Sequence, residues 1–172
     1  MQRGRTRTRR AVSETDGPPC LDRPAHFALP CRCSDDDLAQ WIDDIESFIL
    51  RVAAAGGLDE DSAYYLGIAL REALMNAIRH GVGRNGRPRV RVSVRALRRG
   101  ILAITVRDHG PGFDPAEVAD PLSPENLDRS SGRGLLYMRR FTDRLAFAFP
   151  AHGAIVRLEK RLPLATVSCT SR

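Results

Sequence analysis

Lysine is almost absent from the sequence, and several nucleotide-binding schemes depend on it. Of the 27 basic residues only Lys160 is a lysine, and it lies in RLEKRL. There is no G-K-[ST] motif, which excludes a P-loop. The V-A-I-K-type lysine and the H-R-D motif are also missing, which excludes the eukaryotic-type protein kinase motif set. Any nucleotide chemistry in this chain must therefore follow another scheme.

Long hydrophobic runs and paired cysteines are lacking as well. No stretch reaches the roughly 18 apolar residues of a membrane span, and no secretory apolar region follows the start, so we expect a cytoplasmic protein with no membrane partner. The four cysteines are Cys20, Cys31, Cys33 and Cys169. The pair Cys31-x-Cys33 has no matching second pair, which argues against zinc, and disulfides are not expected without an export signal. We expect reduced cysteines.

Positive charge is concentrated at one end of the chain. The first ten residues hold five arginines and no acid, whereas the other 162 residues carry 22 basic and 21 acidic groups, a net charge of +1. We predict a disordered Arg- and Pro-rich tail over residues 1–24, one domain over 25–163, and a C-terminal tail over 164–172. Because the domain is near neutral, we expect no direct nucleic-acid binding. A tail that touches nucleic acid or an acidic partner is the alternative.

Hydrophobic periodicity predicts alternating helices and strands. Apolar residues at spacings of three and four predict one helix from the N-cap Ser34 to Gly56, and another that begins near Asp59 or Asp61 and runs to about His80. The remaining periodic segments predict strands over 26–31, 88–97, 101–108, 144–150 and 153–162, and a helix over 135–143. This order predicts an α/β two-layer sandwich, with a mostly antiparallel mixed sheet and helices on one face.

The second predicted helix carries an unexpected polar stripe. In REALMNAIRHG, residues 71–81, Glu72, Asn76 and His80 recur at every fourth position, and each step rotates by only about 40° around a helix. Asparagine is a poor helix former because its side chain competes for backbone hydrogen bonds. An ordinary exposed polar face is the simpler explanation of the stripe. The alternative is that a carboxylate and an amide oxygen suit a hard divalent cation such as magnesium.

Two glycine motifs follow the stripe. Asp108 ends a predicted strand and begins DHGPGFD, in which glycines let the backbone approach a ligand closely. GRGL, residues 132–135, leads straight into a helix, whose unpaired N–H groups can bind phosphate. Each motif alone is also a common turn. The connection 109–134, with a short helix expected at 115–119, is long for a compact domain, which favours a functional loop.

The ordered combination of E-x-x-x-N, D-x-G-x-G and G-x-G-L resembles the GHKL (Bergerat-fold) ATP-binding superfamily. REALMNAIRHG, VRDHGPGFD and GRGLLYMRRFTDRL are most similar to its branch of anti-sigma-factor serine/threonine kinases, over about residues 26–162. The resemblance implies a histidine kinase-like ATP-binding domain that uses ATP and Mg²⁺. Histidine kinases of this superfamily carry a phospho-accepting histidine on an upstream helix, and residues 34–55 contain none. We therefore expect a free-standing domain that acts on another protein.

The resemblance also implies roles for individual residues. Glu72 resembles the catalytic carboxylate that orients or deprotonates the attacking hydroxyl, and Asn76 resembles the magnesium ligand. Asp108 resembles the carboxylate that accepts the adenine amino group. Further nucleotide contacts are implied for Gly110, Gly112, Gly132, Arg133, Gly134 and Leu135, with residues 113–131 as a lid. Arg79 and Arg133 either steady phosphate charge or are simply solvated, and His80 has no assigned role.

Together these roles imply an ATP-dependent protein serine/threonine kinase. It would phosphorylate an anti-sigma factor antagonist and sequester a sigma factor, and whether it forms a homodimer is left open. The alternative is a nucleotide-gated protein-binding switch with negligible phosphotransfer. An intact Glu72 argues against the switch, because a pure binder does not need a catalytic carboxylate.

Overall fold

The computed structural model of the 172-residue chain describes residues 24–30, 34–82, 88–97, 100–110, 133–150 and 153–163. The elements are, in order, β1 (Ala25–Ala28), α1 (Asp35–Ala55), α2 (Glu60–His80), β2 (Arg91–Leu97), β3 (Ile101–Arg107), α3 (Arg133–Phe141), β4 (Arg144–Ala148) and β5 (Ile155–Arg161). No helix in these ranges is long and apolar enough to cross a membrane. The structure does not describe the four cysteines, residues 1–23 of the predicted N-terminal tail, the whole predicted C-terminal tail, the predicted lid or the short helix expected at 115–119.

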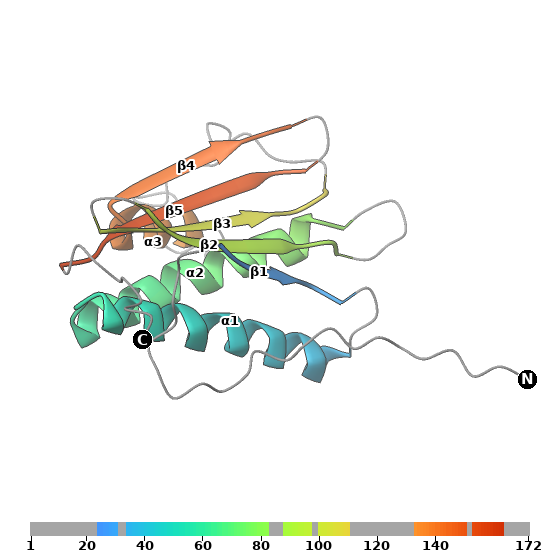
Figure 1. The fold of residues 1–172 in the computed structure, drawn as a ribbon. Helices are drawn as coiled ribbons and strands as arrows, with labels where there is room; N and C mark the ends of the chain where they lie inside the picture. Colours follow the sequence, from blue (N-terminus) through green and yellow to red (C-terminus); the bar gives the residue numbers. More distant parts are fainter. Residues whose placement is uncertain are drawn as a thin grey trace, which may run out of the picture.

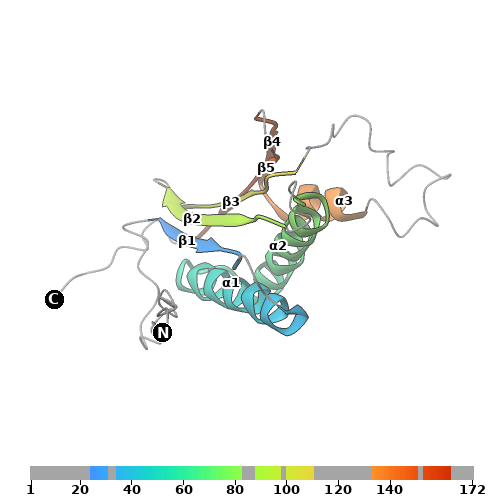
Figure 2. The ribbon, with the colours of Figure 1, turned by 90° about the vertical axis from the view of Figure 1, so that its right-hand side faces the viewer.

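The sheet forms one layer and the described helices form the other (Figures 1 and 2). Its five strands lie in the order β1-β2-β3-β5-β4. Every described pair of neighbouring strands is antiparallel, so the sheet is more uniform than the mixed sheet expected from the sequence. The predicted two-layer α/β sandwich is confirmed.

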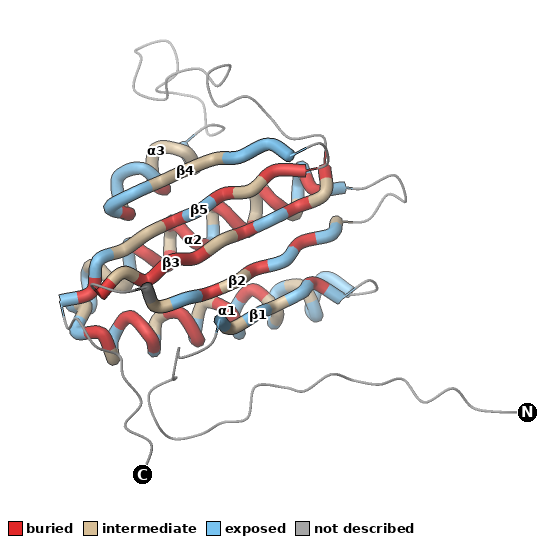
Figure 3. Tube along the Cα trace, turned by 45° about the horizontal axis from the view of Figure 1, so that its top comes forward, coloured by how far each residue is buried: buried red, intermediate tan, exposed pale blue. Residues whose placement is uncertain are grey.

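The core fills the space between the two layers. Alternate residues of the strands point into it, among them Val92 and Val94 of β2, and Figure 3 shows buried and exposed positions alternating along β2. The helices contribute fully buried Ile45, Ile49 and Leu70. Removing such a side chain from water stabilises the fold by about 1.5–3 kcal/mol. Burial of the inner faces therefore fixes how α1 and α2 lie on the sheet.

Acidic and hydroxyl side chains fix the starts of the two long helices. Ser34 and Asp37 form a capping box, in which each side chain accepts a hydrogen bond from the other residue's backbone N–H. Asp59 accepts a hydrogen bond from the backbone N–H of Ser62, at 2.8 Å, at the start of α2. These hydrogen bonds lower the pKa of both carboxyls below the ordinary value of 3.8. Both helix starts agree with the sequence prediction.

Other element bounds differ from the prediction by a few residues. Strand β2 begins at Arg91 and not at Pro88, which makes only an isolated bridge with Val82. Proline has no backbone N–H to donate to a neighbouring strand, so the regular pairing of β2 does not continue back to Pro88. Helix α3 begins at Arg133, two residues earlier than predicted, and ends at Phe141. The glycine at position 134 therefore lies inside the first turn of α3.

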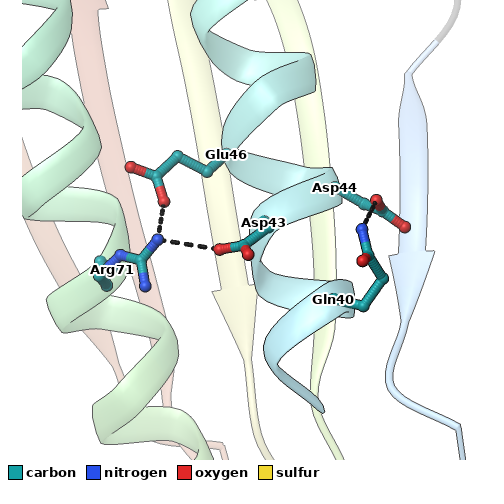
Figure 4. Close-up of polar contacts among 5 residues, drawn as sticks. All are labelled: Gln40, Asp43, Asp44, Glu46 and Arg71. Atoms are coloured by element: carbon teal, nitrogen blue, oxygen red, sulfur yellow. Dashed lines mark hydrogen bonds and ion pairs between the residues drawn. The ribbon is translucent and has the colours of Figure 1, made fainter. Parts of the chain in front are cut away.

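An ion-pair network joins α1 to α2 at the surface (Figure 4). The guanidinium of Arg71 contacts the carboxylates of Asp43, at 3.0 Å, and Glu46. These contacts, the hydrogen bond to Glu46 above all, raise the pKa of Arg71. The Arg71 side chain is half exposed, so each pair contributes at most about 1 kcal/mol. The network adds a modest contact between the exposed sides of α1 and α2.

Candidate functional site

Helix α3 lies antiparallel to α2 and is aligned by an aromatic stack. Tyr65, near the start of α2, stacks on Phe141 at the end of α3, with ring centroids 4.6 Å apart. Gly134, at the start of α3, lies against Glu72. Tyr65 and Glu72 are separated by about 10.5 Å along α2, and Phe141 and Gly134 by the same rise along α3. The stack therefore sets the alignment that brings the GRGL motif to the E-x-x-x-N motif.

The contact at Gly134 leaves no room for a side chain. A Cβ atom at this position would lie 2.6 Å from Glu72 Oε2 and 3.5 Å from Asn76 Nδ2, and real Cβ atoms essentially never approach closer than 3.0 Å. Glu72 and Asn76 are half-buried, whereas His80 at the end of the stripe is exposed. Helix α3 thus covers the polar stripe at its first two positions. Three residues predicted for the site lie together here.

Asp108 is buried at the end of β3, with 6% of its surface exposed. Its Oδ1 accepts hydrogen bonds from the backbone N–H groups of Gly110, at 2.8 Å, and Ala154, at 3.1 Å. The backbone N–H of Asp108 in turn donates to the carbonyl of Ala154 at 3.0 Å. Hydrogen bonds to a charged group contribute about 1.5–3 kcal/mol each, so the carboxylate is firmly oriented. Within the described residues Oδ2 receives no hydrogen bond, so it can accept one from a ligand.

Three glycines let separate chain segments meet around Asp108. A Cβ atom at Gly81 would lie 2.6 Å from the Cβ of Asp108, and one at Gly110 would collide with the carbonyl oxygen of His80. Gly153 has a φ of 93°, and a Cβ atom there would collide with the carbonyl oxygen of Asp108. The end of α2, the end of β3 and the turn before β5 are therefore in direct backbone contact.

Gly153 and Ala154 were not predicted to belong to the site. The sequence indicated only a turn between two strands at this point. Residues 151 and 152 lie outside the described residues, but β4 and β5 pair antiparallel on either side and Gly153 has a positive φ. Ala154 acts through its backbone N–H, which every residue except proline carries, and it lies 46 positions after Asp108. Neither residue type nor spacing could therefore have identified this contact.

The metal-ligating capacity of the described site is small. The described residues contain no cluster of three or more His, Cys, Asp or Glu side chains that could hold a metal ion. Asn76 offers one carboxamide oxygen, with the carboxylate of Glu72 one turn earlier. Magnesium typically keeps several waters and takes one or two protein ligands plus substrate phosphates. The donor set fits a magnesium ion held mainly through a nucleotide and does not fit a protein-only metal site.

The remaining predicted nucleotide contacts are only partly described. Gly112 and Gly132 lie outside the described residues. Arg133 is the first residue of α3 and is exposed, whereas Leu135 is half-buried and packs against the core. Arg79 is exposed near the end of α2. The nucleotide contacts of these residues stay predictions.

One protein family matches most of this chain. The family model of the histidine kinase-like ATPase domain matches residues 36–160, which is well over half of the chain. The chain therefore belongs to the histidine kinase-like ATPase domain family. The GHKL resemblance inferred from the three motifs is confirmed.

Similar proteins narrow the position of the chain within this family. The anti-sigma F factor of Bacillus subtilis (strain 168) is 37% identical over 103 residues, which cover 57% of this chain and 68% of that protein. The anti-sigma F factor of Heyndrickxia coagulans is 38% identical over 103 residues, 57% of this chain and 69% of that protein. These similarities confirm the predicted resemblance to the anti-sigma branch.

A solved structure supports the fold independently. The histidine kinase domain from the Erythrobacter litoralis EL346 blue-light activated histidine kinase superimposes with a TM-score of 0.51. The alignment covers 84% of this chain and 71% of that chain, at 18% sequence identity. At this identity the similarity concerns the fold alone.

Proposed function

We propose that this chain is an ATP-dependent anti-sigma factor serine/threonine-protein kinase of the cytoplasm, which phosphorylates an anti-sigma factor antagonist and sequesters a sigma factor. The observation that carries the proposal is the position of Gly134 against Glu72 and Asn76. It brings a helix N-terminus, a carboxylate and a carboxamide to one place. Phosphoryl transfer depends mainly on such positioning and on neutralising charge. The similarity to anti-sigma F factors supports the choice of partners.

The described residues can hold the two ends of ATP. Oδ2 of Asp108 would accept a hydrogen bond from the adenine amino group, because Oδ1 is already held by two backbone N–H groups. The phosphates would lie at the start of α3, whose unpaired N–H groups attract anions and where Gly134 allows close approach. Asn76 would supply one oxygen ligand to magnesium, which neutralises phosphate charge when bound. A catalytic lysine is not required by this arrangement.

Glu72 would act on the partner's hydroxyl group. As the serine or threonine oxygen forms its bond to the γ-phosphorus, the Glu72 carboxylate takes the hydroxyl proton. The bond between the γ-phosphorus and the bridging oxygen breaks, and ADP leaves with that electron pair. A positioned base of this kind contributes roughly 10²–10⁴ to the rate. The half-buried position of Glu72 beside α3 keeps its carboxylate in a defined place.

The decisive experiment measures phosphate transfer from radiolabelled ATP to the partner that co-purifies with the chain, beside titrations of ATP affinity. Glu72→Ala is expected to retain ATP binding while the transfer rate falls by roughly 10²–10⁴. Asn76→Ala is expected to lose magnesium-dependent ATP affinity and transfer together, because one oxygen ligand is removed. Glu60→Ala, at an exposed position of the same helix, is the matched control and should behave like wild type.

Each outcome distinguishes between the alternatives. Transfer at the wild-type rate in Glu72→Ala would remove Glu72 from the role of base. A wild-type protein that binds ATP and its partner but labels nothing would instead be the nucleotide-gated binding switch. A wild-type protein that binds no ATP would contradict both functions.

A further inference from the structure

The face of the sheet that points away from the helices carries almost only positive charge. Residues such as Val92, Ile104 and Leu158 point into the core, so their neighbours along each strand point the opposite way. Six arginines occupy these outward positions, and with Glu159 they define what we call the open face: Arg91, Arg95, Arg107, Arg144, Arg157 and Arg161. Figure 3 looks onto this face, with the helices behind it.

The charge of the open face is not balanced locally. All six arginines are exposed, and Glu159 is the only acid at the outward positions of the described strands. Its carboxylate is bonded to Nε of Arg157 at 2.7 Å. Helix α1, in the other layer, carries six acids and one arginine. The domain's small net charge therefore hides a basic face and an acidic helix, a separation that the sequence total did not reveal.

Strand register places the arginines close to one another. Arg91 of β2 lies directly opposite Arg107 of β3. Like charges at directly opposite positions destabilise a sheet, so nothing in the folding of the chain favours this pair. Nearby, Arg144 and Arg157 line a shallow pocket of about 290 Å³ together with Ala146 and Glu159. An anionic ligand would offset the repulsion, and the pocket offers a place for one of its side chains.

We propose that the open face binds an acidic, partly apolar segment of a partner protein. The planar guanidinium of arginine can donate two parallel hydrogen bonds to one carboxylate, which the ammonium of lysine cannot do. Ile101 and Ile155 occupy outward positions beside the arginines, so apolar groups of the segment also find partners. A second copy using the same face is disfavoured, because an isologous contact would place arginines against arginines.

Single-stranded nucleic acid fits the open face less well than an acidic protein segment does. Proteins that bind single strands stack the bases on aromatic side chains. No aromatic side chain other than the imidazole of His26 occupies an outward position of the described strands, since Phe27 and Phe147 pack toward the core. The proposal does not rest on the kinase function, because the open face and helix α3 lie on opposite sides of the sheet (Figure 2).

The test measures fluorescence anisotropy of a labelled 20-residue peptide of glutamate and leucine in equal parts, in about 50 mM salt, where surface charges are weakly screened. The triple variant Arg91→Glu, Arg95→Glu, Arg107→Glu is expected to weaken binding by on the order of tenfold or more. The control variant changes Arg51, Arg139 and Arg140 of the helical layer to glutamate, which alters the net charge equally. It should bind the peptide within about twofold of wild type.

Further arms separate the competing explanations. ATP affinity, measured by calorimetry, should be the same in the triple variant and wild type, which also shows that the variant is folded. Equal loss of binding in both triple variants would show only a net-charge effect and overturn the proposal. The proposal would also be overturned if deleting residues 1–10 abolished peptide binding while the open-face variant bound the peptide normally. Binding of a 20-nucleotide single strand of DNA more tightly than the peptide, lost in the open-face variant, would replace the protein segment by nucleic acid.

Discussion

Replacing Gly134 by alanine tests the proposed catalytic geometry with a single methyl group. The new Cβ atom would lie 2.6 Å from Glu72 Oε2. To restore an ordinary contact, the carboxylate must retreat by about 0.4–0.8 Å, since carbon–oxygen contacts below about 3.0 Å are strongly repulsive. The obstructing atom is the end of a flexible side chain, so it can move without displacing the helix backbone. The substitution therefore shifts Glu72 and leaves the fold intact.

The expected effects on stability and on transfer have opposite signs. Alanine in place of glycine within a helix stabilises it by roughly 0.5–1 kcal/mol, so the free energy of unfolding should be unchanged or raised by up to this amount. Misplacing a catalytic group by about 1 Å can cost about 10²-fold in rate. We therefore expect Gly134→Ala to be at least as stable as wild type and to transfer phosphate on the order of 10²-fold more slowly.

The assay pairs urea unfolding with radiolabel transfer from ATP to the partner. Gly67→Ala is the matched control, because it makes the same change in α2 and its Cβ would meet Glu46 Oε1 at 3.0 Å, away from Glu72. The control should transfer phosphate at the wild-type rate. A wild-type rate in Gly134→Ala would refute the placement of Glu72 as the base. A large loss of stability would show instead that the contact is rigid and structural.

Two further predictions concern carboxylates at other places in the fold. Asp108→Asn keeps an oxygen for the N–H groups of Gly110 and Ala154, but its amide nitrogen cannot accept a hydrogen bond from the adenine amino group. A loss of roughly 1.5–3 kcal/mol should lower the ATP affinity measured by calorimetry about 10–150-fold. Equal affinity would remove Asp108 from the adenine pocket. The hydrogen bond from the backbone N–H of Ser62 lowers the pKa of Asp59 below its ordinary value of 3.8. The ionised carboxylate therefore stabilises the folded chain above pH 3.8, and this contribution is lost as the pH falls through the lowered pKa. Asp59→Ala should therefore lower the Tm by on the order of a few degrees at pH 7, and the difference from wild type should shrink in scans run below pH 3.8; a difference that does not change with pH would contradict this origin.

Local chemistry made much of the fold predictable. Ser34 is the N-cap that it was predicted to be, and of the two predicted starts of the second helix, Asp59 and Asp61, Asp59 is the N-cap. The strict alternation around Val92 and Val94 predicted a strand with one buried face, and both valines are buried. These features are encoded within a few residues, because capping and side-chain alternation are properties of adjacent backbone.

Features that depend on distant segments were not predictable in the same way. The helical spacing of Glu72 and Asn76 placed them on one stripe, but nothing local indicated that Gly134 would cover them. The family resemblance implied only that Gly134 contacts the nucleotide, and its contact with Glu72 accompanies the stacking of Tyr65 on Phe141. The charge of the open face was hidden for a related reason, since its arginines are spread over four strands and only the sheet register collects them.

The hydrogen bond from Ala154 to Asp108 has a consequence for the order in which the site forms. All three motifs have been synthesised once Leu135 is added, yet Ala154, one of the two residues that donate to the Asp108 carboxylate, comes 19 positions later, just before β5. Pairing β5 with β3 closes a loop of 46 residues, and contacts this distant in sequence form slowly. A nascent chain that already contains every motif thus still lacks one of the two contacts that orient Asp108, the residue proposed to bind adenine. If Asp108 binds adenine as proposed, its full set of contacts would form only when the final hairpin has docked, which would tie ATP binding to completion of the whole sheet.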